Sequence, residues 1–481
     1  MGDPERGISG IEGAIGTHCE EVFSQLPVTA QEKMADVILP LINIDEISGE
    51  ATRRRANIKS VVHDEDSRTF VETFVDNRLL VTNQDNGENY IEIAHEALLK
   101  SWKRLADWID EMQEHLRRMR EIERSVKAWK NNDRNDDFRR QGKQLEQYHN
   151  TIAALQPRLS PETIDYLYAR DIDRMIQDNI PELVAGQSAE SLLQWIDDIN
   201  MSEPVRLMVG LGLSIGGDPR DGVGLQDGVP DITWLPVNGN AGKYDFKDKE
   251  SFVYGVFDVP DFFIAKYQVT YTQYKEFARA DYDNPLWWEG FPEKYQPQRL
   301  KEKITKAVNN PRDSISWYQS VAFARWLNHH LEGVALSHPC GKVFRIGDNA
   351  QIRLPTEWEW QLTAMNGDEE REYPWGKWRS GHANTGEADL GRVIAVGMYP
   401  HGAAKCGAQD MSGNLFEWCA NNYHDPEIID PADTDEKVLR GGAFYYDRHF
   451  SRPSYRHADY PYFEYSLYGV RLVVAPPIPG L

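Results

Sequence analysis

Residues 438–474 read VLRGGAFYYDRHFSRPSYRHADYPYFEYSLYGVRLVV, and they combine a frame of glycines and arginines with an interior rich in aromatic and polar side chains. Seven of the chain's 22 tyrosines lie between Gly442 and Gly469. Tyrosine offers a large, rigid contact area at low entropic cost, and Ser, Asp and His add adaptable hydrogen bonds. This composition is typical of a binding surface, so we predict that the segment contacts a ligand.

Several ordered motifs precede and flank this segment. They are FFIAKYQVTYTQYKEF (262–277), a strand passing into a helix; SISWYQSVAFARWLN (314–328), an amphipathic helix; RLPTEWEWQLTA (353–364), with a capping-box pattern at Thr356 and Glu359; YPWG (373–376); DMSGNLFEW (410–418); and YGVRLVV (468–474). Together they resemble the formylglycine-generating-enzyme family, whose fold is an elaborated C-type lectin fold. The resemblance implies an α+β domain of this type over residues 233–481.

Length and charge limit the function classes. A chain of 481 residues with 41% apolar content is long enough for about two to four domains. The net charge of −23 opposes general binding to nucleic acid or anionic membrane. No apolar run approaches the length of a membrane span, and the four cysteines lack metal-site spacing. We therefore expect a cytoplasmic protein with no nucleic-acid or membrane partner.

The first hundred residues predict short helices followed by a hairpin. LLVTNQDNGENYIEIAHEALL contains two β-rich runs on either side of Asp85-Asn86-Gly87, which is a good hairpin signal. SGIEGAIGTHCEEVFSQL, TRRRA, NRLLVT and EIAHEALLKSW resemble the winged-helix region that follows the ATPase core of bacterial STAND-type NTPases. We predict a winged-helix-like domain over residues 1–103.

Two motifs in this half fail as chemical sites. No GxxxxGK[ST] phosphate loop occurs, so we expect no bound nucleotide, and the chain is expected to be a fragment of a longer receptor or a form that lost its motor. His95-Glu96 begins an HExxH-like string, but Leu99 stands where the second His would be. Arg53–Arg55 predict a solvated loop or an intramolecular contact, with phosphate binding as the alternative.

The middle of the chain predicts a helical connector over residues 104–205. Apolar residues recur at spacings of three and four from Leu105 to Trp129, which indicates one long amphipathic helix. The apolar stripe of this helix predicts packing within the chain, and self-association is the alternative. A glycine-rich linker is expected at 206–232. The predicted fold class is multidomain, with an α-rich winged-helix and helical N-terminal half and an α+β C-type lectin C-terminal half.

The resemblance also implies a metal site. Asp410, Gly413, Leu415 and Glu417 match positions that bind calcium in the family, and closely spaced oxygen donors suit Ca²⁺. The alternative is that Asp410 and Glu417 only buttress the loop. A second family site would use Asn384 and the carbonyl of Thr385, with Asp389 as a match for its acidic ligand.

Catalysis in that family depends on copper held by two cysteine thiolates just after the RGG motif, and Cu(I) requires such soft ligands. This chain has no cysteine between Cys419 and Leu481. A second branch, the iron-dependent sulfoxide synthases, needs a histidine cluster from a helical domain, whereas His95, His115 and His149 are isolated. We therefore predict no copper and no enzyme activity.

The terminal segment resembles the variable proteins of diversity-generating retroelements. In these systems a reverse transcriptase randomises adenines, chiefly in Asn codons, which yields Asn, Tyr, His, Asp, Ser, Phe and Leu but never Lys, Glu, Gln, Met or Trp. Only one residue of these five excluded types, Glu464, occurs between Phe444 and Tyr468. The frame RGG…R…P…GVR places Arg452, Arg456 and Pro461 in fixed positions, together with Gly469.

Matching this frame predicts which positions vary and bind ligand, whereas Phe444 is expected to be a scaffold aromatic. The predicted positions are Tyr445, Tyr446, Asp447, His449, Phe450, His457, Ala458, Asp459, Tyr460, Phe463, Tyr465, Ser466 and Leu467. We predict a non-enzymatic receptor of a STAND-type signalling or defence system that binds a protein or other macromolecule. The alternatives are a fixed-specificity sensor and a formylglycine-generating copper oxidase.

Overall fold

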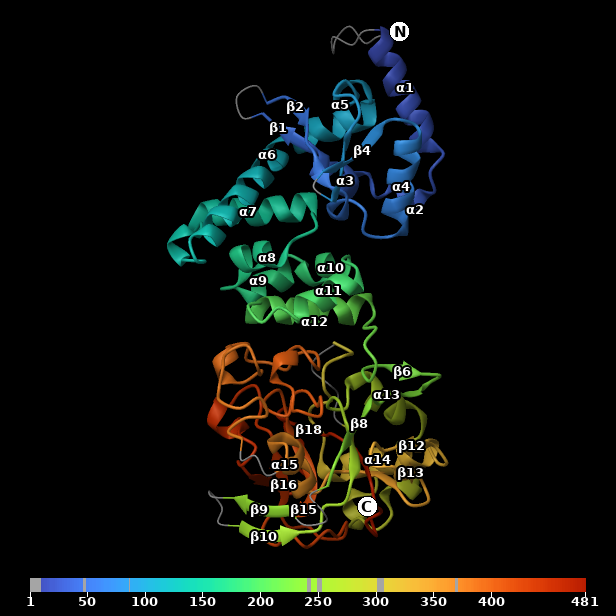
Figure 1. The fold of residues 1–481 in the computed structure, drawn as a ribbon, viewed down its shortest axis with the longest axis vertical. Helices are drawn as coiled ribbons and strands as arrows, with labels where there is room; N and C mark the ends of the chain where they lie inside the picture. The colour runs from blue at the N-terminus through green and yellow to red at the C-terminus, as the bar shows by residue number, and fades with distance from the viewer. Residues whose placement is uncertain are drawn as a thin grey trace. The chain divides into compact units, whose positions relative to one another are not determined.

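The computed structural model describes residues 10–45, 49–85, 87–239, 244–248, 253–300, 307–367 and 371–481. The chain divides into two compact units, Met1–Ser188 and Ala189–Leu481 (Figure 1). The first unit is mainly helical, and the second combines two four-stranded sheets with short helices. The predicted change from a helical half to an α+β half is therefore confirmed.

The first unit begins with helices and a small sheet. Its elements are α1 (Gly10–Ser24), α2 (Val28–Gln31), α3 (Met34–Ile38), η1 (Leu39–Leu41), β1 (Ile42–Ile44), β2 (Ala51–Arg53), β3 (Ala56–Asn57), η2 (Ile58–Ser60), α4 (Glu65–Asp76), β4 (Leu80–Asp85), β5 (Glu88–Ile93) and α5 (Leu98–Ser101). Strands β4 and β5 pair antiparallel from Leu80↔Ile93 to Asp85↔Glu88, which confirms the hairpin. Asn86 of the predicted turn lies outside the described residues.

Helix α6 (Lys103–Asn131) is the predicted long helix, and its buried stripe includes Leu105, Leu116 and Trp129. The helices that follow are α7 (Gly142–Leu155), α8 (Pro161–Tyr168), α9 (Ile172–Gln177) and α10 (Ile180–Ala185), with η3 (Asp136–Phe138) between α6 and α7. Helix α7 packs against α6, and both helices contribute buried apolar side chains.

The glycine-rich stretch expected to be a linker at 206–232 begins inside a helix. Helices α11 (Ala189–Ile196) and α12 (Glu203–Gly216) both belong to the second unit. A Cβ at Gly210 would lie 2.9 Å from the Cβ of Ala395, so this glycine permits close packing of the helix on the domain. Buried Arg206 fixes the helix further by donating to the carbonyl of Met398 at 2.8 Å. These long-range contacts are why a glycine-rich sequence is helical here.

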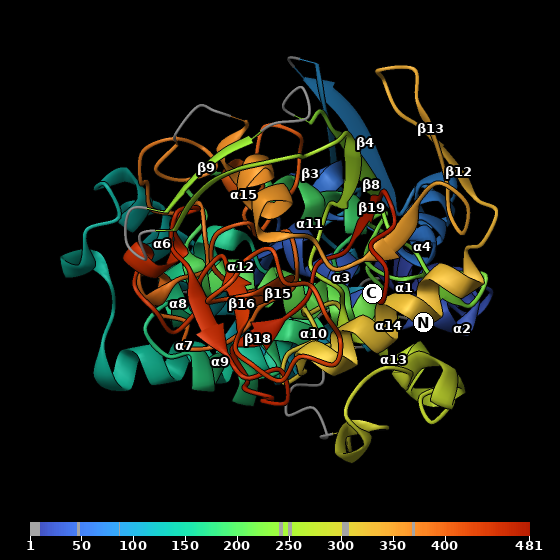
Figure 2. The ribbon, with the colours of Figure 1, turned by 90° about the horizontal axis from the view of Figure 1, so that it is seen from below.

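Two sheets organise the second unit. The first has the order β14-β19-β11-β8, formed by β14 (Gln351–Arg353), β19 (Val473–Ala475), β11 (Phe262–Ala265) and β8 (Trp234–Val237). The second has the order β17-β16-β15-β18, formed by β17 (His457–Asp459), β16 (Lys437–Arg440), β15 (Phe416–Asn422) and β18 (Tyr468–Gly469). Figure 2 shows β15, β16 and β18 beside one another.

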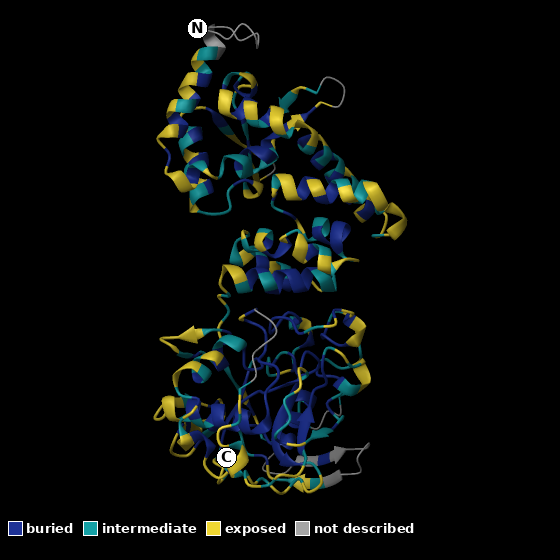
Figure 3. Cartoon of the chain, turned by 180° about the vertical axis from the view of Figure 1, so that it is seen from behind, coloured by how far each residue is buried: buried dark blue, intermediate teal, exposed yellow. Residues whose placement is uncertain are grey.

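Helices α13 (Tyr271–Ala280), α14 (Trp317–His330) and α15 (Glu357–Met365) complete the core. The remaining elements are β6 (Leu225–Gln226), β7 (Val229–Pro230), β9 (Tyr244–Asp248), β10 (Val253–Phe257), β12 (Ala335–Ser337), β13 (Val343–Arg345) and the 3-10 turns η4 (Pro285–Trp288), η5 (Glu293–Tyr295), η6 (Gly386–Ala388), η7 (Pro400–Gly402) and η8 (Arg448–Ser451). The predicted capping box is present, with the Thr356 hydroxyl accepting from the Glu359 amide. The segments in the interior of this unit consist mainly of buried residues, which are dark blue in Figure 3.

A buried ion pair joins the two sheets to helix α15. Arg471 donates to Glu417 at 2.8 Å, and both side chains are 0% exposed. Glu417 also accepts from Trp360 Nε1 at 2.6 Å and from Gln268 Nε2 at 3.0 Å. The other Arg471 donors reach the carbonyls of Ala265, Lys266 and Gln409. The charges are therefore fully paired and hydrogen-bonded in the core.

Among the described residues, no helix combines the length and apolar character that crossing a membrane requires.

Removing either Arg471 or Glu417 leaves the charge of the other residue buried and without compensation. We expect Arg471→Met to lower the free energy of unfolding of the second unit by about 3–5 kcal/mol. Denaturation followed by tryptophan fluorescence reports mainly on this unit, because ten of the 14 tryptophans lie at or after Trp234. Arg448→Met is the matched control, since Arg448 is 54% exposed and 3.9 Å from Glu387, and it should change stability by under about 0.5 kcal/mol. Equal effects of the two changes would contradict this assignment.

Candidate functional site

The terminal segment leaves β16 through a turn that only glycine permits. Gly441 and Gly442 have φ values of 95° and 74°. A Cβ at Gly442 would lie 2.2 Å from the Ser451 hydroxyl oxygen, and also 2.8 Å from the Ser451 Cα and 2.9 Å from the Phe450 carbonyl oxygen, so the backbone of the loop would have to move. The preceding Arg440 is buried and donates to the carbonyls of Pro453 and Tyr455 at 2.8 and 2.9 Å. The two ends of the loop 441–455 are therefore tied together.

The arginines and glycine of the predicted frame are held by the scaffold. Arg456 forms a bidentate pair with Glu357 of α15 at 2.7 and 2.9 Å, with side chains 1% and 0% exposed. Arg452 reaches Glu372 at 3.1 Å near the surface. A Cβ at Gly469 would lie 2.8 Å from Leu415 Cδ1, because β18 runs parallel beside β15. These contacts therefore hold the backbone of the segment in place at Arg456 and Gly469.

The thirteen side chains predicted to bind ligand lie at the surface of this frame. Six are exposed, namely Tyr445, Asp447, His449, Tyr460, Tyr465 and Ser466, and the other seven are half-buried, namely Tyr446, Phe450, His457, Ala458, Asp459, Phe463 and Leu467. Tyr445 is 71% exposed and Tyr465 is 50% exposed, although both are large aromatic rings. Phe444, predicted to be scaffold, is half-buried and its amide donates to the Asn414 carbonyl at 3.0 Å. Three of the half-buried residues, Tyr446, Phe450 and Leu467, pack against the core, and the role of all thirteen in binding stays a prediction.

Ring contacts connect these side chains into one aromatic platform, which we define as Tyr445, Tyr446, Phe450, His457, Tyr460, Phe463 and Tyr465. The contacts run through Tyr445–Tyr446, Tyr446–Phe450, Tyr446–Phe416, Phe416–His457, His457–Tyr468, Tyr468–Tyr465, Tyr465–Phe463 and Phe463–Tyr460, with centroids 4.8–6.1 Å apart. Phe416 and Tyr468 are the buried members of this chain of rings. The platform therefore rests directly on the domain core.

Polar groups lie among these rings. The Tyr468 hydroxyl donates to Asp459 at 2.7 Å and lies 3.2 Å from His457 Nε2. Burial lowers the pKa of His457, so its imidazole is neutral at pH 7. Burial also raises the pKa of Tyr468 well above its usual range, and the adjacent Asp459 adds to this effect. The platform thus offers neutral donors and acceptors beside the Asp459 carboxylate.

Glu464, the one residue in the segment that randomised Asn codons cannot supply, has a scaffold role. Its Oε1 accepts from Gln319 Nε2 at 2.8 Å, and Gln319 is fully buried at the start of α14. The same Gln319 side chain accepts from the Ser316 amide in the capping box of that helix. The partner lies 145 residues away in sequence, so sequence analysis had no signal for this contact.

Tyr295 adds an aromatic ring that sequence analysis missed. It belongs to η5, outside the terminal segment, and stacks on Tyr462 with centroids 5.3 Å apart and on Tyr318 at 5.1 Å. Lys294 lies 4.7 Å from the same ring. No motif surrounds η5, and only the fold brings it to the edge of the platform.

The residues predicted to bind calcium are engaged within the protein. Both Glu417 oxygens are paired with Arg471 and Trp360, and the Leu415 carbonyl accepts from Gln268 Nε2 at 2.9 Å. Burial raises the pKa of Asp410 to about 6, and its Oδ2 accepts from the Gly397 amide at 2.7 Å. Because the Arg471 guanidinium already neutralises Glu417, a calcium ion at this place would have to compete with that ion pair.

The second predicted calcium site has one feature that suits a cation. Asn384 Oδ1 is buried and has no hydrogen-bond partner among the described residues, whereas its Nδ2 donates to the carbonyl of Arg392 and to Asn414. An unpaired buried oxygen is costly unless something binds it. Calcium binding by this chain, at either place, stays a prediction.

The position of the family's copper thiolates is occupied by the start of the platform, Tyr445 and its neighbours. Elsewhere in the domain, Cys419 is buried and Cys406 is half-buried, and desolvation raises the pKa of both thiols. Both cysteines therefore remain neutral thiols at pH 7, and a neutral thiol is a poor metal ligand.

The three consecutive arginines of the first unit make contacts within that unit, as expected. Arg54 pairs with Glu123 at 2.9 Å, and Arg55 lies 3.6 Å from Asp85 and over the Tyr90 ring at 4.1 Å. Arg53 donates weakly to the carbonyl of Ala94 at 3.4 Å. Two of the three charges are therefore paired with carboxylates of the same unit.

Comparison with known proteins identifies both halves of the chain. Residues 237–476 match the model of the Sulfatase-modifying factor enzyme 1-like domain. The C-terminal half is a domain of this type. Residues 6–137 match the model named Novel STAND NTPase 1, so the chain combines this domain with a STAND NTPase region.

Relatives of the C-terminal half include enzymes. Hercynine oxygenase of Mycolicibacterium smegmatis is 27% identical over 253 residues, covering 45% of this chain and 54% of that protein. Formylglycine-generating enzyme of Thermomonospora curvata is 28% identical over 186 residues, covering 33% and 53%. The chain thus spans about half the length of these relatives. Among solved structures, Treponema denticola variable protein 1 is similar with a TM-score of 0.39 and 18% identity, covering 51% of this chain and 96% of that one.

The prediction that this chain is not an enzyme is contradicted by these relatives, whose names are those of enzymes. The missing thiolates were too narrow a ground for excluding every enzyme activity. Missing copper thiolates exclude one mechanism, whereas one fold supports several chemistries with different residues.

The pH dependence of stability tests whether Asp410 binds calcium or only buttresses its loop. Its pKa in the folded protein, about 6, lies above that of an unfolded chain, so the carboxylate destabilises the fold increasingly as the pH rises through about 6. We expect Asp410→Asn to raise the free energy of unfolding by about 2 kcal/mol near neutral pH, with the gain lost below about pH 4. Urea denaturation at several pH values, with and without Ca²⁺, checks this. A calcium ligand would instead show a loss of Ca²⁺-dependent stability in the variant.

Glu464 and Ser466 provide a matched pair within one loop. Glu464→Ala removes the acceptor of a buried amide and should cost about 1–2 kcal/mol of stability. Ser466→Ala removes an exposed hydroxyl and should change stability by under about 0.5 kcal/mol. Thermal and chemical denaturation of both variants measures the difference. If both substitutions change stability by the same small amount, the contact with Gln319 does not explain why Glu464 is present.

Proposed function

We propose that this chain is a ligand-recognition protein of a STAND-type signalling or defence system, in which residues 444–468 display a diversified binding surface. The observation that carries the proposal is the division within this segment. Frame residues such as Gly442, Arg456 and Gly469 are buried or sterically fixed, whereas the thirteen positions predicted to vary are exposed or half-buried and none is fully buried. Such a division permits side chains to change without changing the backbone.

The chemistry of the platform suits a protein or other macromolecule. Binding energy at protein interfaces is concentrated in a few Tyr, Trp and Arg side chains near the centre of the contact. Tyr445, Tyr460 and Tyr465 are each at least 41% exposed, and each is in contact with further rings beneath or beside it. They would act as rigid anchors, while Asp447, His449 and Ser466 would supply hydrogen bonds.

The N-terminal unit would connect recognition to signalling. We propose that its first hundred residues form a winged-helix-like domain, since helices α1 and α4 precede the antiparallel hairpin β4–β5. Self-association would use the helical region from α6 onward. The family match over residues 6–137 supports the STAND assignment and is silent on both of these details.

The gene tests the diversification directly. A nearby reverse-transcriptase gene and a near-identical template that differs from the 444–468 coding region only at adenines would establish it. A coding region with no such template would favour the fixed-specificity sensor. In that case the same platform would bind one ligand.

An enzyme reaction is the second candidate, and the named relatives favour it. Hercynine-dependent oxygen uptake by the purified chain, with Fe²⁺ or Cu⁺ added, tests an activity like that of the hercynine oxygenases. Conversion of a cysteine-containing peptide tests an activity like that of the formylglycine-generating enzymes. Either activity could coexist with ligand recognition on the platform.

Tolerance of substitution tests whether the surface is built to vary. Replacing Tyr445, Tyr460 and Tyr465 together by Ser should lower the melting temperature by only a few degrees, since these rings are largely exposed. Gly442→Ser alone should destabilise the domain by more than about 2 kcal/mol, because its side chain would meet Ser451 and its φ is positive. Differential scanning calorimetry compares the two proteins. If the triple variant unfolds and the glycine variant does not, the surface is structural and the proposal is wrong.

A further inference from the structure

A second group of chemically reactive side chains lies at a hairpin tip, apart from the aromatic platform. Strands β12 and β13 are joined by His338-Pro339-Cys340-Gly341-Lys342. The His338 amide donates to the Lys342 carbonyl at 2.8 Å, and the Gly341 amide donates to the His338 carbonyl at 2.9 Å. Gly341 has a φ of 89°, which closes the turn. The turn holds His338 and Cys340 close together.

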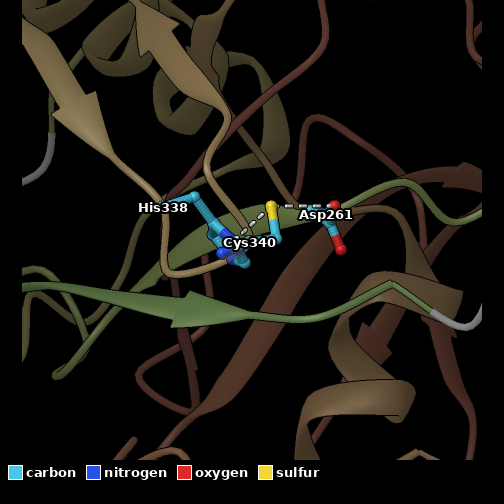
Figure 4. Close-up of side chains that lie close together, drawn as sticks. All are labelled: Asp261, His338 and Cys340. Atoms are coloured by element: carbon cyan, nitrogen blue, oxygen red, sulfur yellow. Dashed lines mark hydrogen bonds between the residues drawn. The ribbon is translucent and has the colours of Figure 1, made fainter.

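The third member of the group comes from another part of the chain. Asp261 immediately precedes β11, and its Oδ1 accepts from the Gly239 amide at 2.9 Å. Its Oδ2 lies 3.3 Å from Cys340 Sγ, which in turn lies 2.9 Å from His338 Nδ1 (Figure 4). All three ligand atoms lie within 4.8 Å of one another.

The protonation state of His338 is set by its neighbours. Its Nε2 lies 3.3 Å from the Val237 carbonyl, which can only accept, so Nε2 carries the proton. The Cys340 amide donates to Nδ1 at 3.3 Å, which also requires an unprotonated Nδ1. The ring is 3% exposed and packs edge-on against Phe263. A backbone carbonyl that fixes the tautomer of a histidine is the usual arrangement behind a metal ligand, and a metal at Nδ1 would displace the Cys340 amide from that atom.

We propose that His338 Nδ1, Cys340 Sγ and Asp261 Oδ2 bind a zinc ion, with solvent in the fourth position. One sulfur, one imidazole and one carboxylate form a donor set suited to tetrahedral Zn²⁺. Zinc–ligand bonds of about 2.0–2.3 Å place neighbouring ligand atoms roughly 3.5 Å apart. The observed Nδ1–Sγ separation of 2.9 Å therefore needs to widen by roughly 0.6 Å, and the Sγ–Oδ2 separation of 3.3 Å by roughly 0.2 Å. Cys340 is exposed at the hairpin tip, so it can make this movement.

Lys342 competes with the metal in this arrangement. Its Nζ lies 2.8 Å from Asp261 Oδ2, and its side chain is 61% exposed. The Gly239 amide and the Cys340 thiol also donate to this carboxylate. Zinc would take the place of the ammonium and release the Cys340 thiol proton to solvent. The bound ion would tie the hairpin tip to the sheet edge formed by β8 and β11.

Titration of the full, reduced, metal-free chain with Zn²⁺ tests the site, with Co²⁺ as a spectroscopic probe of thiolate ligation. We expect one tight equivalent, a thiolate-to-cobalt charge-transfer band, and a rise in melting temperature on adding Zn²⁺. Cys340→Ser and Asp261→Asn should each weaken binding at least tenfold. Lys342→Gln should strengthen it severalfold, because the competing cation is gone.

Cys406→Ser is the control, since it removes a thiol of the same domain that lies outside the group. It should leave the affinity and the cobalt spectrum unchanged. The proposal is overturned if no charge-transfer band appears, if Cys340→Ser binds as tightly as the unaltered chain, or if Lys342→Gln weakens binding. None of these outcomes bears on residues 444–468, so the two proposals stand or fall separately.

Discussion

The domain that carries the platform depends on the buried pair of Arg471 and Glu417. Neither side chain has access to water, so each charge must be compensated by the protein itself. The compensation comes from Trp360, Gln268 and three backbone carbonyls, contributed by separate segments of the chain. Satisfying this one pair therefore fixes the relative positions of both sheets and of helix α15.

The same device recurs where the terminal segment meets the scaffold. Arg456 is paired with Glu357, and Arg353 is paired with Glu359 at 2.8 Å, both in the buried first turn of α15. Directional, desolvated pairs of this kind specify one geometry, whereas apolar packing alone tolerates sliding. The backbone of the terminal segment is therefore held at Arg456 by a buried pair, whereas the rings of Tyr445, Tyr460 and Tyr465 are exposed.

Local sequence signals predicted the elements that depend on near neighbours. The β4–β5 hairpin, the long helix α6 and the capping box at Thr356 each follow from residues within a turn or a helical repeat of one another. Prediction failed where the partner is distant. The glycines of α12 looked like a linker because Ala395, against which Gly210 packs, is 185 residues further on. Asp261 and Cys340 were not associated, since no spacing rule joins residues on different strands.

The sequence by itself determined the two-part organisation, the fold type of the C-terminal half and the separation of a fixed frame from a tyrosine-rich interior, because these are properties of composition and ordered motifs. Only the tertiary structure decided what individual charged residues do. The structure pairs Glu417, a predicted calcium ligand, with Arg471, and it places Glu464, which the pattern of the segment did not explain, against Gln319. The physical reason is the same in both cases. The role of a carboxylate is set by which donors the fold brings within hydrogen-bonding distance, and those donors are remote in sequence.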